Sequence, residues 1–118
     1  MSQHSIVHVE IPAQDPEAAN AFYSKLFGWK HEYYPNLNYH RFYTEEGPGG
    51  GYVAVGDQAG HKINQVRISI LTDDIEDTLA KVEELGGKTV TSKTEIPDMG
   101  WFAIFTDPQG NTIGLFTY

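Results

Sequence analysis

The sequence predicts an α+β fold built from two tandem βαβββ units. Two observations lead to this prediction. A strand of alternating apolar residues followed by a capped helix occurs twice in the chain. The two copies are related by a constant offset of 59 residues, which separates Asp15 from Asp74 in the two helix caps. We expect the units at about residues 5–56 and 64–118, within a single domain that covers residues 1–118.

The first unit opens with a half-buried strand. One face of this strand is apolar and consists of Val7, Val9 and Ile11. The other face carries His8 and Glu10, because successive side chains of a strand point to opposite sides. Two ionisable groups on one face of a core strand mark this strand as a candidate for function.

A helix follows the first strand of each unit. Asp15 can cap the first helix, and Pro16 suits its first turn, where a missing N–H costs no hydrogen bond. The apolar stripe of this helix recurs every four residues and consists of Ala18, Phe22 and Leu26. We expect Gly28 to end the first helix and Gly87 to end the second helix at the equivalent position.

The remaining elements complete each unit in the same order. The first half is expected to continue with strands at 29–34, 39–44 and 52–55, a glycine-rich loop at 45–51 and a polar connector at 56–64. The second half is expected to contain a helix at 74–86 and strands at 65–72, 88–94, 101–106 and 112–117. Between its last two strands lies Asp107-Pro108-Gln109-Gly110, which has the residues of a tight turn.

Composition narrows the classes of function. The formal net charge of −8 argues against binding to nucleic acid or to an anionic membrane surface, since both need a basic patch. No stretch is long and apolar enough to cross a bilayer, and the first residues do not form a targeting leader. The chain has no cysteine, hence neither disulfides nor thiolate ligands. We therefore expect a cytoplasmic protein that binds neither nucleic acid nor membrane.

Three segments carry a resemblance to a known superfamily. They are HVEIPAQDPEAANAFYSKLFGW at 8–29, LTDDIEDTLAKVEELGGK at 71–88 and WFAIFTDPQGNTIGLF at 101–116. With these segments the chain resembles the vicinal oxygen chelate superfamily, which includes glyoxalase I, bleomycin-resistance proteins and extradiol dioxygenases. It is most similar to a glyoxalase-like subgroup whose activities are mostly unassigned. The resemblance implies a curved mixed sheet around a cleft with the helices on its convex side. It also implies a homodimer and, in many members, a divalent metal in the cleft.

The resemblance further implies one metal ligand on the first strand and one on the last strand of each half. His8 occupies the first of these four positions. Its counterpart in the second half, Arg67, is a cation and cannot ligate a metal. Gly114 stands in the last strand where the superfamily pattern has a carboxylate, and the predicted strand 52–55 contains no His, Glu or Gln.

We therefore expect no tightly bound cofactor, because a single imidazole does not hold a metal tightly. The alternative is a divalent metal held through His8 together with other side chains. The side chains with the chemistry to rebuild such a site are Glu10, His40 and His61, and their directions do not follow from the sequence.

Polar groups on the equivalent first strands of the two halves form the candidate catalytic site. His8 or Glu10 is the candidate general base. Arg67, with Ser69 beside it, is the candidate binding group for a carboxylate or phosphate. In the alternative interpretation, Glu10 and Arg67 form an internal ion pair with no catalytic role. The candidate apolar walls of a ligand site, equally compatible with a sheet core or a dimer interface, are Tyr43, Tyr52 and Trp101.

These features predict a glyoxalase-like small-molecule binding protein with a degraded metal site, with or without a metal-independent activity. The alternative is a divalent-metal-dependent lyase, isomerase or dioxygenase of the glyoxalase type. We expect a homodimer, because a second chain can cover exposed sheet edges. The sequence leaves open the ligand, whether any reaction is catalysed, and whether the units pair within one chain or are swapped between chains.

Overall fold

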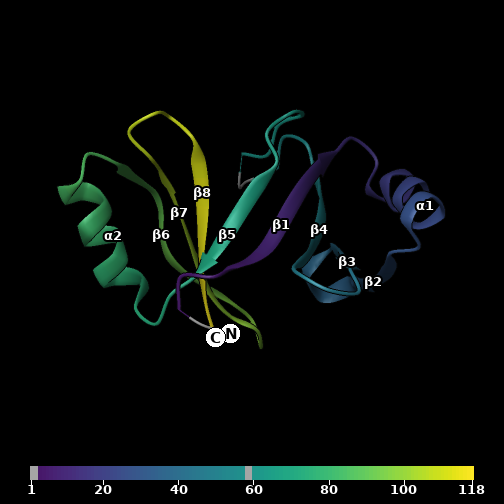
Figure 1. The fold of residues 1–118 in the computed structure, drawn as a ribbon, viewed down its shortest axis with the longest axis horizontal. Helices are drawn as coiled ribbons and strands as arrows, with labels where there is room; N and C mark the ends of the chain where they lie inside the picture. The colour runs from purple at the N-terminus through teal and green to yellow at the C-terminus, as the bar shows by residue number, and fades with distance from the viewer. Residues whose placement is uncertain (1–2, 58–59) are drawn as a thin grey trace. The chain divides into compact units, whose positions relative to one another are not determined.

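A computed structural model describes residues 3–57 and 60–118 of the chain. They form two compact units. The N-terminal unit comprises residues 7–57 and 60–67, and the C-terminal unit comprises residues 3–6 and 68–118. Each unit contains one helix and a four-stranded mixed arrangement in βαβββ order (Figure 1). The predicted α+β class and the tandem units are therefore confirmed.

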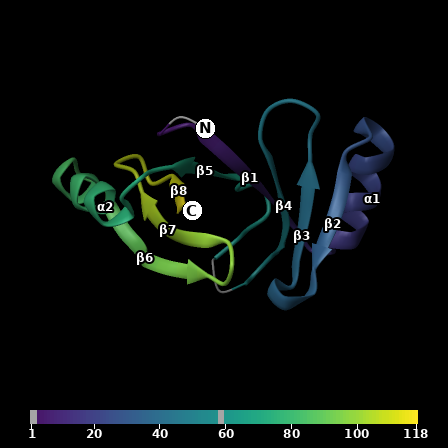
Figure 2. The ribbon, with the colours of Figure 1, turned by 90° about the horizontal axis from the view of Figure 1, so that it is seen from below.

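In the N-terminal unit the chain order is β1 (Ile6–Ala13), α1 (Pro16–Phe27), β2 (Lys30–Tyr34), β3 (Tyr39–Tyr43) and β4 (Gly49–Ala54). A 3-10 helix at Pro35–Leu37 connects β2 to β3. The strands lie in the order β2-β3-β4-β1, with β1 parallel to β4 and the other pairs antiparallel. α1 packs against β2, β3 and β4 (Figure 2).

α1 begins and ends at the predicted residues. The carboxylate of Asp15 accepts hydrogen bonds from the backbone N–H groups of Glu17 and Ala18, at 3.1 and 3.2 Å. Gly28 lies in the left-handed region at φ 75°, and its N–H donates to the carbonyl of Ser24 at 2.8 Å. These bonds satisfy backbone groups that the helix leaves unpaired at its two ends.

An aromatic cluster forms the core between α1 and its strands. Tyr52 is 1 % exposed and Phe42 is 2 % exposed. Tyr23 of α1 stacks on Tyr52 with ring centroids 5.7 Å apart, and Trp29 stacks on Phe42 with centroids 4.9 Å apart. Because Phe42 and Tyr52 lie under α1, the residues that alternate with them along β3 and β4 point to the opposite face.

The start of β4 corrects one prediction. The sequence predicts a loop at 45–51, whereas β4 already begins at Gly49, which pairs with His8. A Cβ at Gly50 would overlap the backbone carbonyl of Val9, so glycine is required where β4 approaches β1. The strand is hidden in the sequence because glycine is depleted in strands and resembles a loop signal.

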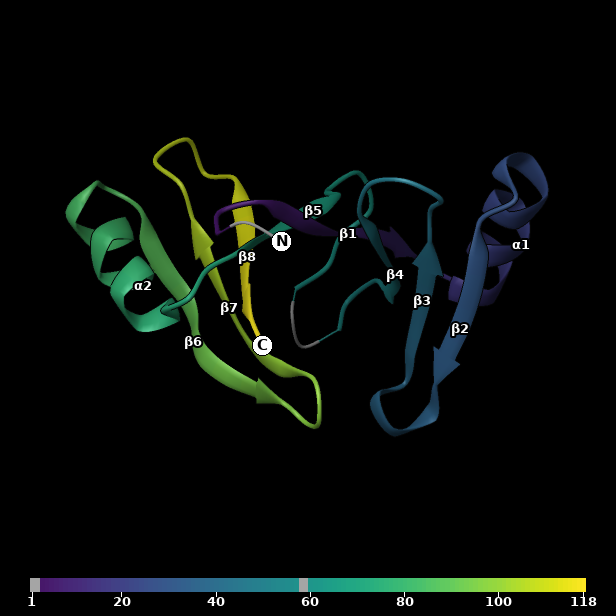
Figure 3. The ribbon, with the colours of Figure 1, turned by 60° about the horizontal axis from the view of Figure 1, so that its bottom comes forward.

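In the C-terminal unit the chain order is β5 (Arg67–Leu71), α2 (Ile75–Glu84), β6 (Lys88–Ile96), β7 (Gly100–Thr106) and β8 (Thr112–Thr117). The strand order β5-β8-β7-β6 repeats that of the N-terminal unit, with the first and last strands parallel. α2 lies along β6, β7 and β8 (Figure 3). The buried core between them consists of Ile75, Leu79, Ala103 and Leu115.

α2 shows the predicted cap and a corrected end. The carboxylate of Asp74 accepts from the N–H of Asp77 at 2.9 Å. Gly86, rather than the predicted Gly87, adopts the left-handed conformation, with φ 97°. Gly87 is required for close approach instead, since a Cβ there would lie 2.6 Å from the carbonyl of Thr106. Neither α1 nor α2 is long and apolar enough to cross a membrane.

Candidate functional site

The candidate site lies on the side of the N-terminal strands that faces away from α1, which we name the network face. β1 contributes His8 and Glu10 to it, and β3 contributes Tyr39 and Arg41. The side chains of His8 and Glu10 are 25 % and 19 % exposed. A row of hydrogen bonds, which we name the polar network, connects Asp57, His61, Glu10, Tyr39 and His8.

Tyr39 joins β3 to β1 across β4. Its hydroxyl lies 2.5 Å from Nε2 of His8 and donates a 2.9 Å hydrogen bond to Oε2 of Glu10. The residue beneath the phenol is Gly51, which pairs with Glu10 on β1 and with Arg41 on β3. A Cβ at Gly51 would overlap the phenol of Tyr39. The glycine therefore allows Tyr39 to reach a strand that is not its neighbour.

His61 completes the polar network from the connector that follows β4. Its Nε2 lies 2.8 Å from Oε1 of Glu10, and its Nδ1 lies 2.6 Å from Oδ2 of Asp57. The backbone N–H of His61 also donates to Oδ1 of Asp57 at 3.1 Å. The imidazole is 4 % exposed. Because carboxylates accept at both ring nitrogens, both nitrogens carry hydrogen and the ring is an imidazolium.

The pKa values in the polar network follow from burial and pairing. Burial opposes the charge of His61, but its bonds to Glu10 and Asp57 outweigh burial and raise the pKa of His61. Burial also opposes the charge of Glu10, and its bond to His61 leaves the pKa of Glu10 lowered. The pKa of His8 is lowered by burial, which outweighs the raising effect of the Glu10 charge, and Arg41 makes the smallest contribution, also lowering. At neutral pH the network thus holds a charged His61–Glu10 pair and a neutral His8.

The hydrogen bonds decide which nitrogen of His8 carries the proton. The Tyr39 hydroxyl donates its hydrogen to Glu10, so its oxygen accepts from the Nε2–H of His8. Burial and the negative charge of Glu10 raise the pKa of Tyr39, which keeps the phenol protonated in this role. Nδ1 of His8 is then unprotonated, and its lone pair is the acceptor that a general base needs.

The four ligand positions that the resemblance implies do not fit a metal here. Gly114 pairs with Ser69, and Gly51 pairs with Glu10, while Ser69 and Glu10 are equivalent through the 59-residue offset. Gly51 is therefore the first-half counterpart of Gly114, and neither glycine has a ligating atom. A Cβ at Gly114 would lie 2.5 Å from Oγ of Ser69, so this position is also filled. The third position is an arginine, which leaves His8 alone.

The side chains with the chemistry to rebuild a metal site are placed for other contacts. Glu10 and His61 pair with each other, and Nδ1 of His40 lies 3.1 Å from Nε2 of His31 on the far side of the same strands. Within residues 3–57 and 60–118, no group of three His, Cys, Asp or Glu side chains is arranged to hold a metal ion. The chemistry below is therefore assigned to the side chains of this chain.

Arg67 and Ser69 are not part of the polar network. Arg67 is 7 % exposed at the start of β5, where its positive charge opposes the protonation of His61. The ion partner of Glu10 is His61 at 2.8 Å, which corrects the alternative of an internal pair between Glu10 and Arg67. Ser69 lies in the C-terminal unit against Gly114.

The predicted aromatic walls lie in three different places. Tyr43 is on the network face, where its hydroxyl donates to Oε1 of Glu32 at 2.9 Å. Tyr52 lies in the core under α1, so it does not line the network face. Trp101 belongs to the C-terminal unit, and Nζ of Lys93 lies 4.8 Å from the centroid of its ring.

Sequence reasoning missed Tyr39, Arg41 and Asp57 as site residues. The alternation along the predicted strand at 39–44 does place Tyr39 and Arg41 on one face. It does not show that β3 reaches β1, because the pairing of β1 with β4 depends on contacts distant in sequence. Asp57 and His61 lie in a connector, where no periodic pattern fixes the direction of a side chain.

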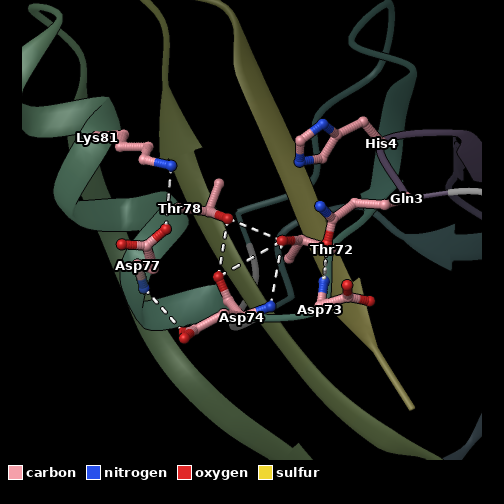
Figure 4. A pocket seen from close by; sticks show the side chains of 8 residues that line it. All are labelled: Gln3, His4, Thr72, Asp73, Asp74, Asp77, Thr78 and Lys81. Carbon is pink, nitrogen blue, oxygen red and sulfur yellow. Dashed lines mark hydrogen bonds and ion pairs between the residues drawn. The ribbon is translucent and has the colours of Figure 1, made fainter.

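A separate hollow of about 320 Å³ lies in the C-terminal unit at the start of α2 (Figure 4). Its polar side chains largely bond to one another. The hydroxyls of Thr72 and Thr78 are 2.8 Å apart, and Nζ of Lys81 lies 3.2 Å from Oδ2 of Asp77. We assign these groups to the capping of α2 rather than to a ligand site.

Comparisons with known proteins decide the family. A family model described as a glyoxalase-like domain matches residues 7–116. The chain belongs to the glyoxalase-like domain family. A glyoxylase-like domain-containing protein from Didymella fabae is 31 % identical to this glyoxalase-like chain over 117 residues, which cover 92 % of this chain and 90 % of that protein. The predicted membership in the vicinal oxygen chelate superfamily is confirmed.

Two solved structures share the glyoxalase-like fold at low sequence identity. A glyoxalase/bleomycin resistance protein/dioxygenase superfamily member from Vibrio splendidus 12B01 has a TM-score of 0.69 and 13 % identity, covering 98 % of this chain and all of that one (100 %). Methylmalonyl-CoA epimerase from Mycobacterium tuberculosis has a TM-score of 0.68 and 13 % identity, covering 95 % of this chain and 86 % of that chain. At these identities the likeness extends to the fold and not to the reaction.

Proposed function

We propose that this glyoxalase-like protein binds a small molecule at the network face and uses His8 as a general base without a metal. The observation that carries the proposal is the 2.5 Å contact between Nε2 of His8 and the hydroxyl of Tyr39. This contact holds a neutral imidazole in one tautomer and leaves Nδ1 to accept a proton.

The reaction class that suits this arrangement is removal of a proton from a carbon next to a carbonyl. The C–H bond breaks, an N–H bond forms at Nδ1 of His8, and the electron pair moves to the carbonyl oxygen. The imidazolium that forms is stabilised through Tyr39 by the carboxylate of Glu10. Tyr39 and Glu10 thus act as positioning residues, and His8 is the catalytic residue.

Hydrogen–deuterium exchange tests the proposal. Pyruvate and dihydroxyacetone are incubated with the protein in D₂O containing EDTA, and loss of the C–H signal is followed by proton NMR. We expect exchange by the native chain and a rate reduced about 10²–10⁴-fold in His8→Gln, the range typical of a lost general base. His4→Gln is the matched control, because His4 is exposed and lies outside the polar network. Exchange that requires an added divalent metal, or that survives in His8→Gln, would contradict the proposal.

A non-catalytic binding protein is the second candidate. The hydrogen bonds of Glu10 and His61 favour it. Both carboxylate oxygens of Glu10 and both ring nitrogens of His61 already have partners, so these side chains are held in fixed positions and line the face without taking part in a reaction. Absence of exchange with both probes, together with a ligand-induced rise in melting temperature, would support this candidate over the catalytic one. The homodimer expected for this family is a separate proposal, and light scattering that gives the mass of one chain would contradict it.

A further inference from the structure

We propose that Arg41 binds the carboxylate of an organic-acid ligand on the network face, beside His8. The inference rests on the proposed function for the location of the site, but it concerns binding and has its own measurement. Arg41 is one of two arginines in a chain with a formal net charge of −8. Three observations carry the inference, and they concern the position of Arg41, its contacts and the carboxylate paired with it in the strand register.

The first observation is the position of Arg41 within the strands. It lies in β3 and pairs with Gly51 of β4, which in turn pairs with Glu10 of β1. Because Gly51 has no side chain, β4 places no side chain between Arg41 and the polar network. The positive charge of Arg41 is near enough to favour the neutral form of His8, although burial has the larger effect on the pKa of His8. His8 and Arg41 therefore lie on the same face, with the guanidinium within electrostatic range of the imidazole.

The second observation is that a buried nitrogen of the guanidinium has no acceptor among the residues that the structure describes. Nε of Arg41 is buried and has no hydrogen-bond partner within residues 3–57 and 60–118. Its Cζ lies 4.8 Å from the centroid of the Tyr43 ring, so the group is held in place by a cation–π contact. Across residues 3–57 and 60–118, no carboxylate forms an ion pair with it. A buried donor normally has a partner, and a carboxylate matches the planar fork of a guanidinium with two parallel hydrogen bonds.

The third observation explains why the carboxylate of the neighbouring strand does not fill this role. Glu32 of β2 pairs with Arg41 in the strand register. Its Oε1 instead accepts hydrogen bonds from Tyr43 at 2.9 Å and from Tyr34 at 3.3 Å. The two phenols hold Glu32 in place without neutralising Arg41. A ligand carboxylate would therefore be repelled by the negative charge of Glu32, but it would not have to break an ion pair in order to bind Arg41.

Malonate and its uncharged amide, malonamide, test the inference in binding titrations followed by NMR and thermal shift. We expect the native chain to bind malonate and not malonamide. Arg41→Met should weaken malonate binding at least about tenfold, as expected for the loss of charge-assisted hydrogen bonds. Lys30→Met is the matched control. Lys30 pairs with Tyr43, so this substitution removes a positive charge from the same face. Glu32→Gln should strengthen malonate binding about two- to fivefold, as for an exposed charge pair.

Three outcomes would overturn the inference. They are equal weakening by Arg41→Met and Lys30→Met, no binding of malonate by the native chain, and tighter binding of inorganic phosphate than of malonate. Arg41→Lys keeps the positive charge but lacks the planar pair of donors of a guanidinium, so it separates the two contributions. Circular dichroism verifies that each variant is folded. His8→Gln separates the two proposals, because it should reduce the rate of proton exchange about 10²–10⁴-fold and leave malonate affinity within about twofold. If malonate binding still depends on Arg41 but proton exchange is unchanged in His8→Gln, the result contradicts the proposed function and leaves the inference about Arg41 standing.

Discussion

The hydroxyl of Tyr39 lies 2.5 Å from Nε2 of His8, although 31 positions separate them and their strands are not neighbours. The strand between them, β4, presents Gly51 at the crossing point, so the phenol can pass over it. The same hydroxyl donates to Glu10, and this chain of bonds fixes the tautomer of His8. A residue of the third strand thus controls the proposed base on the first strand.

Tyr39→Phe is expected to release His8 from its single tautomer. The substitution removes the hydroxyl, leaves Glu10 without one donor, and should lower the free energy of unfolding by about 1–3 kcal/mol. Long-range ¹⁵N–¹H NMR of the imidazole measures the tautomer, and we expect a mixture in place of the Nε2–H form. Tyr33→Phe is the control, because Tyr33 is exposed and donates to Asn38 away from His8. An unchanged tautomer in Tyr39→Phe would contradict the assigned hydrogen bonds.

The pairing of His61 with Glu10 predicts a stability contribution that depends on pH. The raised pKa of His61 means that its contribution is fully present below the unfolded value of 6.5 and is lost as pH rises through the folded pKa. The lowered pKa of Glu10 means that its contribution is present above the unfolded value of 4.5 and is lost as pH falls through the folded pKa. The pair therefore contributes most between these two values.

Urea unfolding of the native chain and of His61→Asn, across and beyond this window, measures the effect. We expect the largest difference between pH 4.5 and 6.5, and a smaller one at higher and lower pH. The lowered pKa of His8 has the opposite effect, because it reduces the stability of the folded chain as pH falls below 6.5. His8 is present in the native chain and in His61→Asn, so its effect cancels in the difference between them. A difference that is constant with pH would show that His61 is neutral in the folded state.

The parts of the fold that were predictable depend on local chemistry. The caps of both helices follow from Asp15 and Asp74, because a capping carboxylate bonds to N–H groups two or three residues ahead. β4 was misplaced because its glycines are set by approach to the carbonyl of Val9 and to the phenol of Tyr39. Such contacts join residues that are distant in sequence, and no local pattern records them.

For the candidate site, too, the local pattern could be predicted from the sequence, and the contacts between distant residues could not. Alternation placed His8 and Glu10 on one face of β1, and the structure joins them through Tyr39. The partner of Glu10 could not be derived, because His61 lies in an irregular connector and Arg67 was an equally suitable cation. Alternation also says nothing about which side α1 covers, so the sequence leaves open whether Tyr52 lines the site or belongs to the sheet core, where the structure places it.

Tyr52→Phe is expected to raise stability slightly and to leave the site unchanged. Among the described residues the buried hydroxyl of Tyr52 has no hydrogen-bond partner, and burial raises the pKa of Tyr52 to about 12. Removing an unsatisfied hydroxyl should be neutral or stabilise by up to about 1 kcal/mol, since no bond is lost. Thermal unfolding measures the change, and proton exchange on pyruvate should be unaffected. Destabilisation of the Phe variant would indicate that the hydroxyl has an acceptor in solution.

Gly51→Ala is expected to disrupt the polar network although it replaces none of the network's own side chains. The added Cβ would overlap the phenol of Tyr39, which cannot move aside without losing its bonds to His8 and Glu10. We expect destabilisation of about 1–3 kcal/mol, as for overpacking, together with the mixed His8 tautomers of Tyr39→Phe. The measurements are urea unfolding and imidazole NMR.

Two matched variants isolate this effect. Gly114→Ala, the counterpart in the C-terminal unit, meets the Oγ of Ser69, a short side chain that can rotate away, so the His8 tautomer should not change. In a Tyr39→Ala background the overlap at Gly51 is gone, and Gly51→Ala should cost little more stability. Full additivity of the two substitutions would show that the crossing of Tyr39 over Gly51 does not hold His8 in place.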